Sequence, residues 1–127
     1  MFFELFSKKS ILISLNNQNL NNMVLRIFQL DTTNENALRC LFLDYDYVKD
    51  NFDFNNYKQV YEDQNFCKVN RFSTIIEEND DILNYIFEKF NRGNYPETYN
   101  GHSLSVSDIV ELDGVRYYVD GFGFVKL

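Results

Sequence analysis

A short serine-rich segment near the C-terminus holds several residue types that enzymes use. Its side chains alternate in the order Ser103, Leu104, Ser105, Val106, Ser107 and Asp108. In an extended chain the serine hydroxyls would share one face and could form a polar binding stripe. Alternatively, Ser107 and Asp108 cap a turn, with their side-chain oxygens accepting hydrogen bonds from backbone N–H groups. We favour the turn.

A serine nucleophile in this segment would need a base and an oxyanion hole. The chain has a single histidine, His102, and it directly precedes Ser103. Side chains of adjacent residues in an extended chain point apart. The G-x-S-x-G turn of many serine hydrolases does not occur in the sequence. We therefore expect no catalytic residue here, and the role of His102 stays open.

A second segment, residues 44–57, mixes carboxylates with aromatic rings. It does not fit the calcium loop of an EF-hand, because Lys49 stands in place of the required glycine and Asn55 in place of the closing glutamate. A solvated acidic loop is one interpretation. Another is a surface for a basic partner protein, since exposed rings among carboxylates suit such an interface. The hypothetical partner-binding residues are Asp44, Asp46, Asp50, Asp53, Tyr45 and Tyr47.

The two cysteines, Cys40 and Cys67, do not form a C-x-x-C motif. Together with one histidine they are too few for a zinc site. We expect two reduced thiols in the core, because free cysteine is among the most buried residue types. We expect neither a metal nor a cofactor.

Length and charge exclude several classes of protein. The chain has 127 residues, a net charge of −7 and 17% aromatic residues. That length suits one domain, and the aromatic content excludes a disordered chain. The negative charge argues against direct nucleic-acid binding, which needs Lys and Arg against the phosphates. No segment resembles a membrane span or a signal peptide, so we expect a cytoplasmic protein.

The elements that position these residues follow from the hydrophobic pattern. Residues 23–30 are apolar on both faces, which predicts a central strand covered on both sides. N-capping residues at 31–34 predict a short helix over 35–43, and residues 57–62 read as a second strand. The expected buried stripe of that helix is Ala37, Leu38, Leu41 and Phe42.

A second helix is predicted from Asp80 or Asp81 to Asn91, with Gly93 as its left-handed cap. Its apolar stripe is Ile82, Leu83, Ile86, Phe87 and Phe90.

The pair Asp113-Gly114 predicts a hairpin over residues 108–120. A two-residue loop pairs Leu112 with Val115, and Glu111 with Arg116 as an opposite-charge pair. The expected core face is Val110, Leu112, Val115, Tyr117 and Val119. Glycines at 121 and 123 permit a bend before a third strand over 124–127.

Three separated blocks resemble the YodL-like family of small bacterial domains: IFEKFN at 86–91, GHSLSVSDIV at 101–110 and YYVDGFGF at 117–124. The resemblance leaves residues 1–22 as an N-terminal extension and 23–127 as the domain. The chain departs from the family pattern at His102, where a basic residue is expected, and at Gly121. The family-motif residues are Ser103, Leu104, Ser105, Val106, Ser107, Asp108, Phe122, Gly123 and Phe124.

The resemblance implies a genomic context for the protein but no chemical reaction. Domains of this family are common in genes of conjugative elements and phages, where anti-restriction and anti-defence roles have been proposed, and no reaction is established for them. We expect an α+β fold: a small, mostly antiparallel sheet with two main helices and a C-terminal hairpin at 108–120.

We hypothesise a non-enzymatic accessory protein of a mobile genetic element or phage that binds and inhibits a host protein. The favoured target is a basic, nucleic-acid-handling defence nuclease, without direct contact to nucleic acid or membrane. The alternative is a regulator that binds a host structural or metabolic protein through the SLSVSD and FGF residues. An enzyme of unknown reaction is the third hypothesis.

Overall fold

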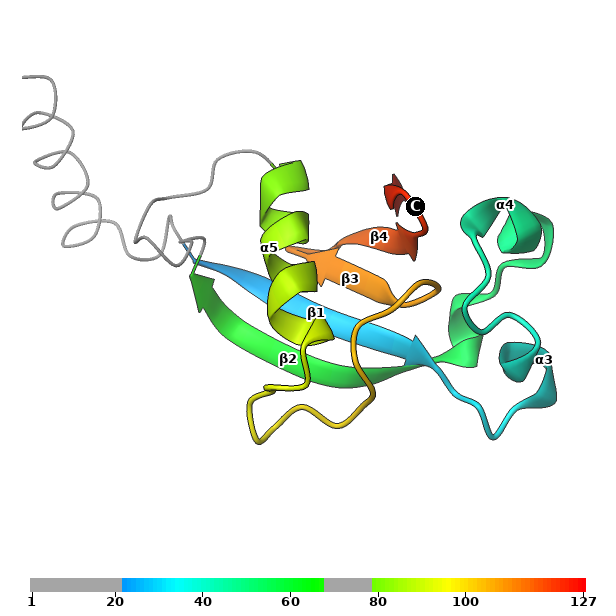
Figure 1. Cartoon of the computed structure of the whole chain (residues 1–127), viewed down its shortest axis with the longest axis horizontal. Helices are drawn as coiled ribbons and strands as arrows, with labels where there is room; N and C mark the ends of the chain where they lie inside the picture. Colours follow the sequence, from blue (N-terminus) through cyan, green and yellow to red (C-terminus); the bar gives the residue numbers. More distant parts are fainter. Residues whose placement is uncertain (1–21, 68–78) are drawn as a thin grey trace, which may run out of the picture.

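The computed structural model describes residues 22–67 and 79–127. These residues form a five-stranded antiparallel sheet with strand order β2-β1-β3-β4-β5 (Figure 1). The strands are β1 (Asn22–Leu30), β2 (Tyr57–Cys67), β3 (Ile109–Leu112), β4 (Val115–Asp120) and β5 (Gly123–Lys126). The predicted α+β fold with a C-terminal hairpin is confirmed.

The helical elements cover the sheet on both faces. The long helix α5 (Asn79–Asn91) lies across one face (Figure 1). The opposite face is covered near one end by short elements between β1 and β2: α3 (Glu35–Leu38), α4 (Tyr45–Val48) and the 3-10 turns η1 (Lys49–Asn51) and η2 (Phe54–Asn56). The predicted extension lies outside the described residues up to residue 21. No described helix is long and apolar enough to span a membrane.

β1 is central, as predicted, and supplies side chains to two separate cores. Leu25 and Ile27 are fully buried on the α5 side. Phe28 lies in the second core, where Ile109 and Tyr118 are also fully buried. An apolar pattern on both faces of a strand is what burial on both faces requires.

The β3–β4 hairpin has the predicted register, with Leu112 opposite Val115 and Glu111 opposite Arg116. Asp113 and Gly114 have φ values of 48° and 86°, as in the type I′ turn that the Asp-Gly pair favours. The Asp113 carboxylate also accepts a hydrogen bond from the Val24 N–H at 2.8 Å, which ties the turn to β1.

Two expectations for the hairpin were wrong. Val115 is 37% exposed, so the expected core face does not extend to the turn. Among the described residues no ion pair joins Glu111 to Arg116. Glu111 instead lies 3.7 Å from the Arg26 guanidinium of β1, and the Arg116 guanidinium lies 3.7 Å from the centre of the Phe54 ring. The Arg116 guanidinium thus packs against an aromatic face, which is a favourable position for a planar cation.

The first predicted helix is shorter than expected. α3 ends at Leu38, and Phe42 takes a left-handed conformation with φ of 65°. Of the expected stripe, Ala37 is buried, whereas Leu38 and Phe42 are more than half exposed. The chain turns away before a second helical turn can bury these side chains.

The second predicted helix is confirmed as α5. It buries Ile82, Leu83, Ile86 and Phe90, and half-buries Phe87. Gly93 follows its end with φ of 80°, the left-handed cap position.

The expectation of two core cysteines was wrong for one of them. Both thiols are free; Cys40 is half-buried, but Cys67 is exposed at the end of β2. Strand alternation turns Cys67 outward next to the buried Phe66.

Candidate protein-binding surface

The serine-rich segment of the family motif wraps around the buried side chain of Gln29 on β1. The Gln29 Nε2 group donates to the His102 carbonyl at 2.8 Å, and lies 3.1 Å from Asp108 Oδ2. Its Oε1 atom accepts the His102 N–H at 3.0 Å. A buried amide needs such partners, and here they fix residues 102–108 to the centre of the sheet.

Gly101 is required by this close approach. A Cβ atom at this position would lie 2.2 Å from Gln29 Oε1 and 3.0 Å from Val60 Cβ. Any side chain would therefore push the segment away from β1.

Asp108 is fully buried beneath the segment. Its Oδ2 atom accepts the Ser105 N–H at 2.8 Å, whereas Oδ1 has no hydrogen-bond partner among the described residues. Burial raises the pKa of Asp108 to about 8, although hydrogen bonds from Ser105 and Gln29 act in the opposite direction. The carboxyl group therefore carries a proton at neutral pH.

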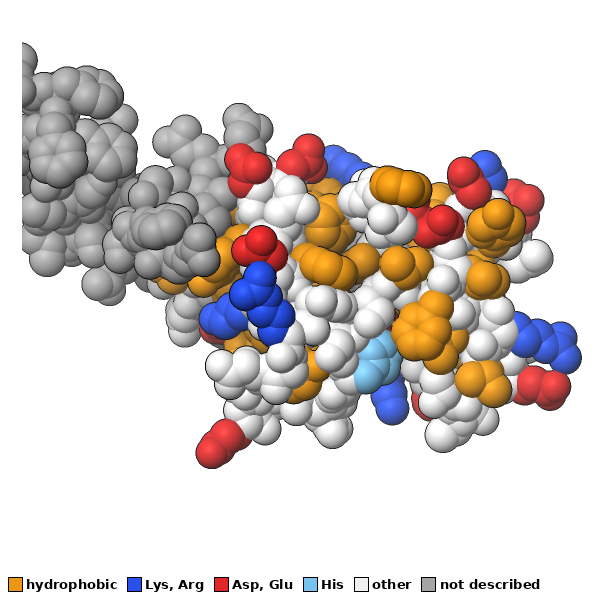
Figure 2. Space-filling model, in the orientation of Figure 1, with side chains coloured by type: hydrophobic (Ala, Val, Ile, Leu, Met, Phe, Trp, Pro, Cys, Tyr) orange, Lys and Arg blue, Asp and Glu red, His pale blue; other side chains and the backbone are white. Residues whose placement is uncertain are grey.

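His102 directs both ring nitrogens at the protein itself. Nδ1 lies 2.7 Å from the Ser103 carbonyl oxygen, and Nε2 lies 3.8 Å from Asp108 Oδ1. The ring is 41% exposed and stands next to apolar side chains (Figure 2). The two ring nitrogens therefore face the Ser103 carbonyl and the Asp108 carboxyl group.

The three serine hydroxyls do not share a face. Ser103 Oγ contacts the Tyr95 hydroxyl, Ser105 Oγ donates to the Ser103 carbonyl at 2.7 Å, and Ser107 Oγ accepts the Phe42 N–H at 3.0 Å. The Asp108 N–H donates to the Ser105 carbonyl at 3.1 Å, and Ser107 has φ of 84°. The segment is thus the turn that we favoured, and the polar stripe was wrong. Of the remaining motif residues here, Leu104 is fully buried and Val106 is half-buried.

Hydrogen bonds to the C-terminal part of the domain hold the segment 42–45 in place. Besides the contact of Ser107 with Phe42, the Tyr118 hydroxyl donates to the Leu43 carbonyl at 2.6 Å. Asp120 Oδ1 accepts the Tyr45 N–H at 2.8 Å. In the other direction, Asp44 Oδ1 accepts the Gly121 N–H at 2.8 Å. The segment 42–45 and the β4–β5 turn therefore form one unit.

This unit and the adjoining helices α3 and α4 present large apolar side chains to solvent. Their exposed fractions are 52% for Leu38, 58% for Phe42, 39% for Leu43, 77% for Tyr47 and 101% for Phe122. We call these five side chains the loop surface. Phe122 belongs to the family motif, whereas its neighbour Phe124 is half-buried against the α5 core and Gly123 has φ of 101°.

The predicted acidic residues lie in and beside α4 and differ in role. Asp46, Asp50 and Asp53 are exposed, and Asp53 also accepts the Asn55 N–H at 2.9 Å. Asp44 is engaged with the β4–β5 turn. Figure 2 shows acidic side chains around α4 and over one end of α5, with apolar side chains between them.

The two predicted aromatic residues, Tyr45 and Tyr47, differ in exposure. Tyr47 is open to solvent, whereas the half-buried ring of Tyr45 lies 5.2 Å from that of Tyr118 in the second core. Tyr45 therefore has a packing role that its sequence context did not reveal.

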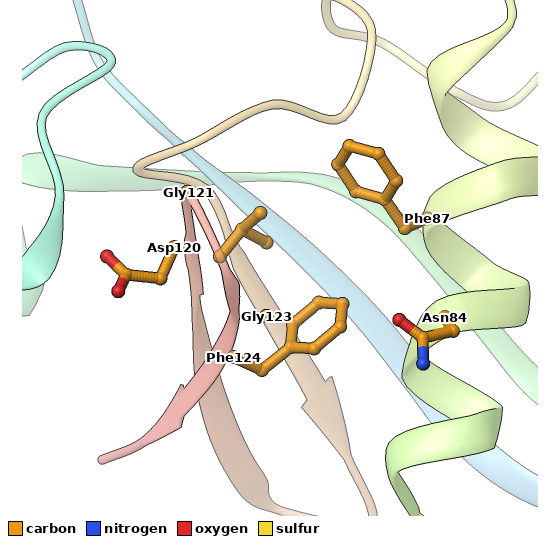
Figure 3. Close-up of a pocket in the computed structure, with 7 residues that line it drawn as sticks. Asn84, Phe87, Asp120, Gly121, Gly123 and Phe124 are labelled. Atoms are coloured by element: carbon orange, nitrogen blue, oxygen red, sulfur yellow. The ribbon is translucent and has the colours of Figure 1, made fainter.

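A small pocket lies next to this surface, between α5 and the β4–β5 turn (Figure 3). Its volume is about 190 Å³. The rings of Phe87 and Phe124 and the side chain of Asn84 face it, whereas the Asp120 carboxylate points away toward α4. The remaining lining residues are Val119, Gly121 and Gly123.

Among the described residues no group of three His, Cys, Asp or Glu side chains is placed to hold a metal ion. The chemically notable groups instead bind one another or the backbone.

These features define a class: a small α+β domain whose C-terminal hairpin and preceding turn hold an exposed loop in place. A family model for the YodL-like domain matches residues 24–127, and the chain belongs to that family. The comparisons with curated proteins and with solved structures gave no significant match.

Proposed function

We propose that this YodL-like domain is a non-enzymatic accessory protein of a mobile genetic element or phage that binds and inhibits a host protein in the cytoplasm. The favoured target is a basic, nucleic-acid-handling defence nuclease. The observation that carries the proposal is the loop surface: exposed rings held in place by hydrogen bonds and surrounded by carboxylates.

Phe122 is the most informative residue of this surface. Its side chain is fully exposed although it lies in the motif block, so it adds nothing to the core. Exposed aromatic side chains are the typical anchors of protein interfaces. A second protein would bury the Phe122 ring and recover the free energy that exposure costs.

Carboxylates around the loop surface favour a basic partner. Residues 31–63 carry eight acids and three bases. Opposite charge speeds association and rejects acidic competitors. A nuclease channel that binds phosphates is such a basic surface, and an acidic protein can occupy it.

The alternative, a regulator of a host structural or metabolic protein, would bind through the SLSVSD and FGF residues, of which Phe122 belongs to the loop surface. The Asp44 carboxylate of the acidic segment is bonded to Gly121, the neighbour of Phe122. The acidic and FGF surfaces are therefore adjacent, and the two hypotheses differ in the nature of the target.

A tagged pull-down from bacterial host lysate at ~0.1 M and ~0.5 M salt tests the proposal, because salt screens exposed charge contacts. We expect a basic nuclease that is held at low salt, released at high salt and inhibited when the purified domain is added. Asp46→Lys and Phe122→Ala should each abolish this inhibition.

The matched controls are Glu97→Lys and Leu127→Ala, which change an exposed charge and an exposed apolar side chain elsewhere. Both should inhibit like the parent. A partner held equally at both salt concentrations would favour the regulator, and inhibition that survives both Asp46→Lys and Phe122→Ala would refute the proposed surface.

A further inference from the structure

The pocket between α5 and the β4–β5 turn has the size of one side chain. Its volume of about 190 Å³ is below the ~300 Å³ at which pockets for small molecules begin. Phe87, Phe124 and Val119 supply the apolar part of its wall, and a polar part of similar extent completes it. A cavity of this kind suits a leucine or phenylalanine side chain of a protein, which is how interface anchors are held.

Carboxylates lie near the pocket on its helix side. On the helix, Asp80 and Glu88 each lie one turn from the lining residue Asn84, and Asp81 lies three residues before it; residues at these spacings are neighbours on a helix surface. On the strand side, the Asp120 carboxylate points away from the pocket (Figure 3) and accepts the Tyr45 N–H, and the Asp44 carboxylate accepts the Gly121 N–H.

Cations are fewer around the pocket. No Lys or Arg belongs to its wall, and Lys126 follows Phe124 at the spacing that shares a strand face. The negative charge on the α5 side of the pocket therefore favours a segment whose apolar residue has a basic neighbour.

We propose that this pocket binds a single leucine or phenylalanine side chain of a partner protein, with Lys or Arg next to that residue in the partner's sequence. The inference deepens the proposed function and rests on it for the protein nature of the partner. Phe122, directly beside the pocket wall, would cover the bound segment.

The proposal is tested on the full chain with synthetic peptides of the form Lys-Arg-X-Arg-Lys, followed by NMR. With X as leucine or phenylalanine, we expect saturable shifts at the amides of Gly121 and Gly123 and at the side-chain amide of Asn84. With X as alanine, affinity should fall about ten-fold or more, because less apolar surface is buried. The acidic peptide Asp-Glu-Leu-Glu-Asp should not bind.

Two variants of α5 separate the pocket from the general acidic surface. Asn84→Phe places a ring at the pocket wall and should abolish binding of the leucine peptide. Lys89→Phe adds the same ring on the same helix, five residues further along, and should leave binding unchanged. Both positions are exposed, so neither variant disturbs the core.

Equal binding of the alanine and leucine peptides would overturn the proposal, as would equal binding of the acidic peptide, or no binding at all. Failure of the pocket is distinguishable from failure of the proposed function. If Asn84→Phe still inhibits the captured nuclease while Asp46→Lys does not, the function stands and the pocket assignment falls.

Discussion

Asp108 Oδ2 and Gln29 Nε2 lie 3.1 Å apart, although 79 residues separate them in the chain. This contact joins the family motif to the central strand of the sheet. From the same turn, the Ser107 hydroxyl accepts the Phe42 N–H, so the motif also fixes the backbone of the exposed loop. The buried polar groups of the motif thus hold the loop surface in place, and Phe122 of the motif is itself part of that surface.

Replacing Gln29 with alanine tests the contact between the motif and β1. The variant leaves the His102 N–H without its partner, whereas the His102 carbonyl keeps the Tyr99 hydroxyl and Asp108 Oδ2 keeps the Ser105 N–H. We expect the free energy of unfolding to fall by about 1–3 kcal/mol, which is the cost of leaving one such group unpaired.

Urea unfolding provides the measurement, and Gln59→Ala is the matched control, because Gln59 is exposed on the neighbouring strand β2. The control should stay within about 0.5 kcal/mol of the parent. Equal losses for the two variants would mean that the buried amide has no special role.

Gly101→Ala tests the close approach to the same side chain. Its Cβ would lie 2.2 Å from Gln29 Oε1, so the segment must shift, and we expect a loss of about 1–3 kcal/mol. In a Gln29→Ala background the space is empty, and the loss should be smaller. A double-mutant cycle by urea unfolding measures the coupling. Additive losses would contradict the proposed steric origin.

The sheet elements could be predicted because their signals are local. Asp113-Gly114 determines a two-residue turn, and that turn fixes the register of every pair in the hairpin. The periodic stripe of α5 and the apolar strand β1 are likewise visible in short windows.

The polar network could not be predicted, because its partners are distant in sequence. Gln29 is a polar residue near the end of a mostly apolar strand, and that contrast is its one local signal. Nothing near Tyr45 indicates that its ring packs against Tyr118, and nothing near Glu111 indicates that Arg26 is the closer cation. Such choices depend on which strands become neighbours.

Tyr118→Phe tests how the second core holds the exposed loop. The variant removes the hydroxyl that donates to the Leu43 carbonyl at 2.6 Å, and keeps the buried ring. We expect a stability loss of about 1 kcal/mol, with faster amide hydrogen exchange at Tyr45 and Gly121. Tyr117→Phe is the control, since the Tyr117 hydroxyl contacts Asn79 instead. Unchanged exchange in Tyr118→Phe would show that the hydroxyl does not fix the loop.

The raised pKa of Asp108 predicts an unusual dependence of stability on pH. The folded pKa is about 8 and the ordinary value is 3.8, so between these values the folded protein holds a proton that the unfolded chain releases. Stability from this group is complete below pH 3.8 and is lost as the pH rises through the folded pKa. From pH 6 to pH 8 we expect a fall of up to about 2–3 kcal/mol.

Asp108→Asn keeps a neutral side chain of the same shape that still accepts from Ser105 and Gln29, so its stability should stay nearly constant over this range. Urea unfolding at intervals from pH 6 to pH 9 gives the two curves. Burial also raises the pKa values of Tyr57, Tyr99 and Tyr118, which is why the range ends at pH 9. His102→Gln in both backgrounds removes the contribution of the neighbouring ring. If the curves of the parent and Asp108→Asn run parallel, the folded protein holds no proton on Asp108 at neutral pH, and the carboxylate must then be stabilised by His102.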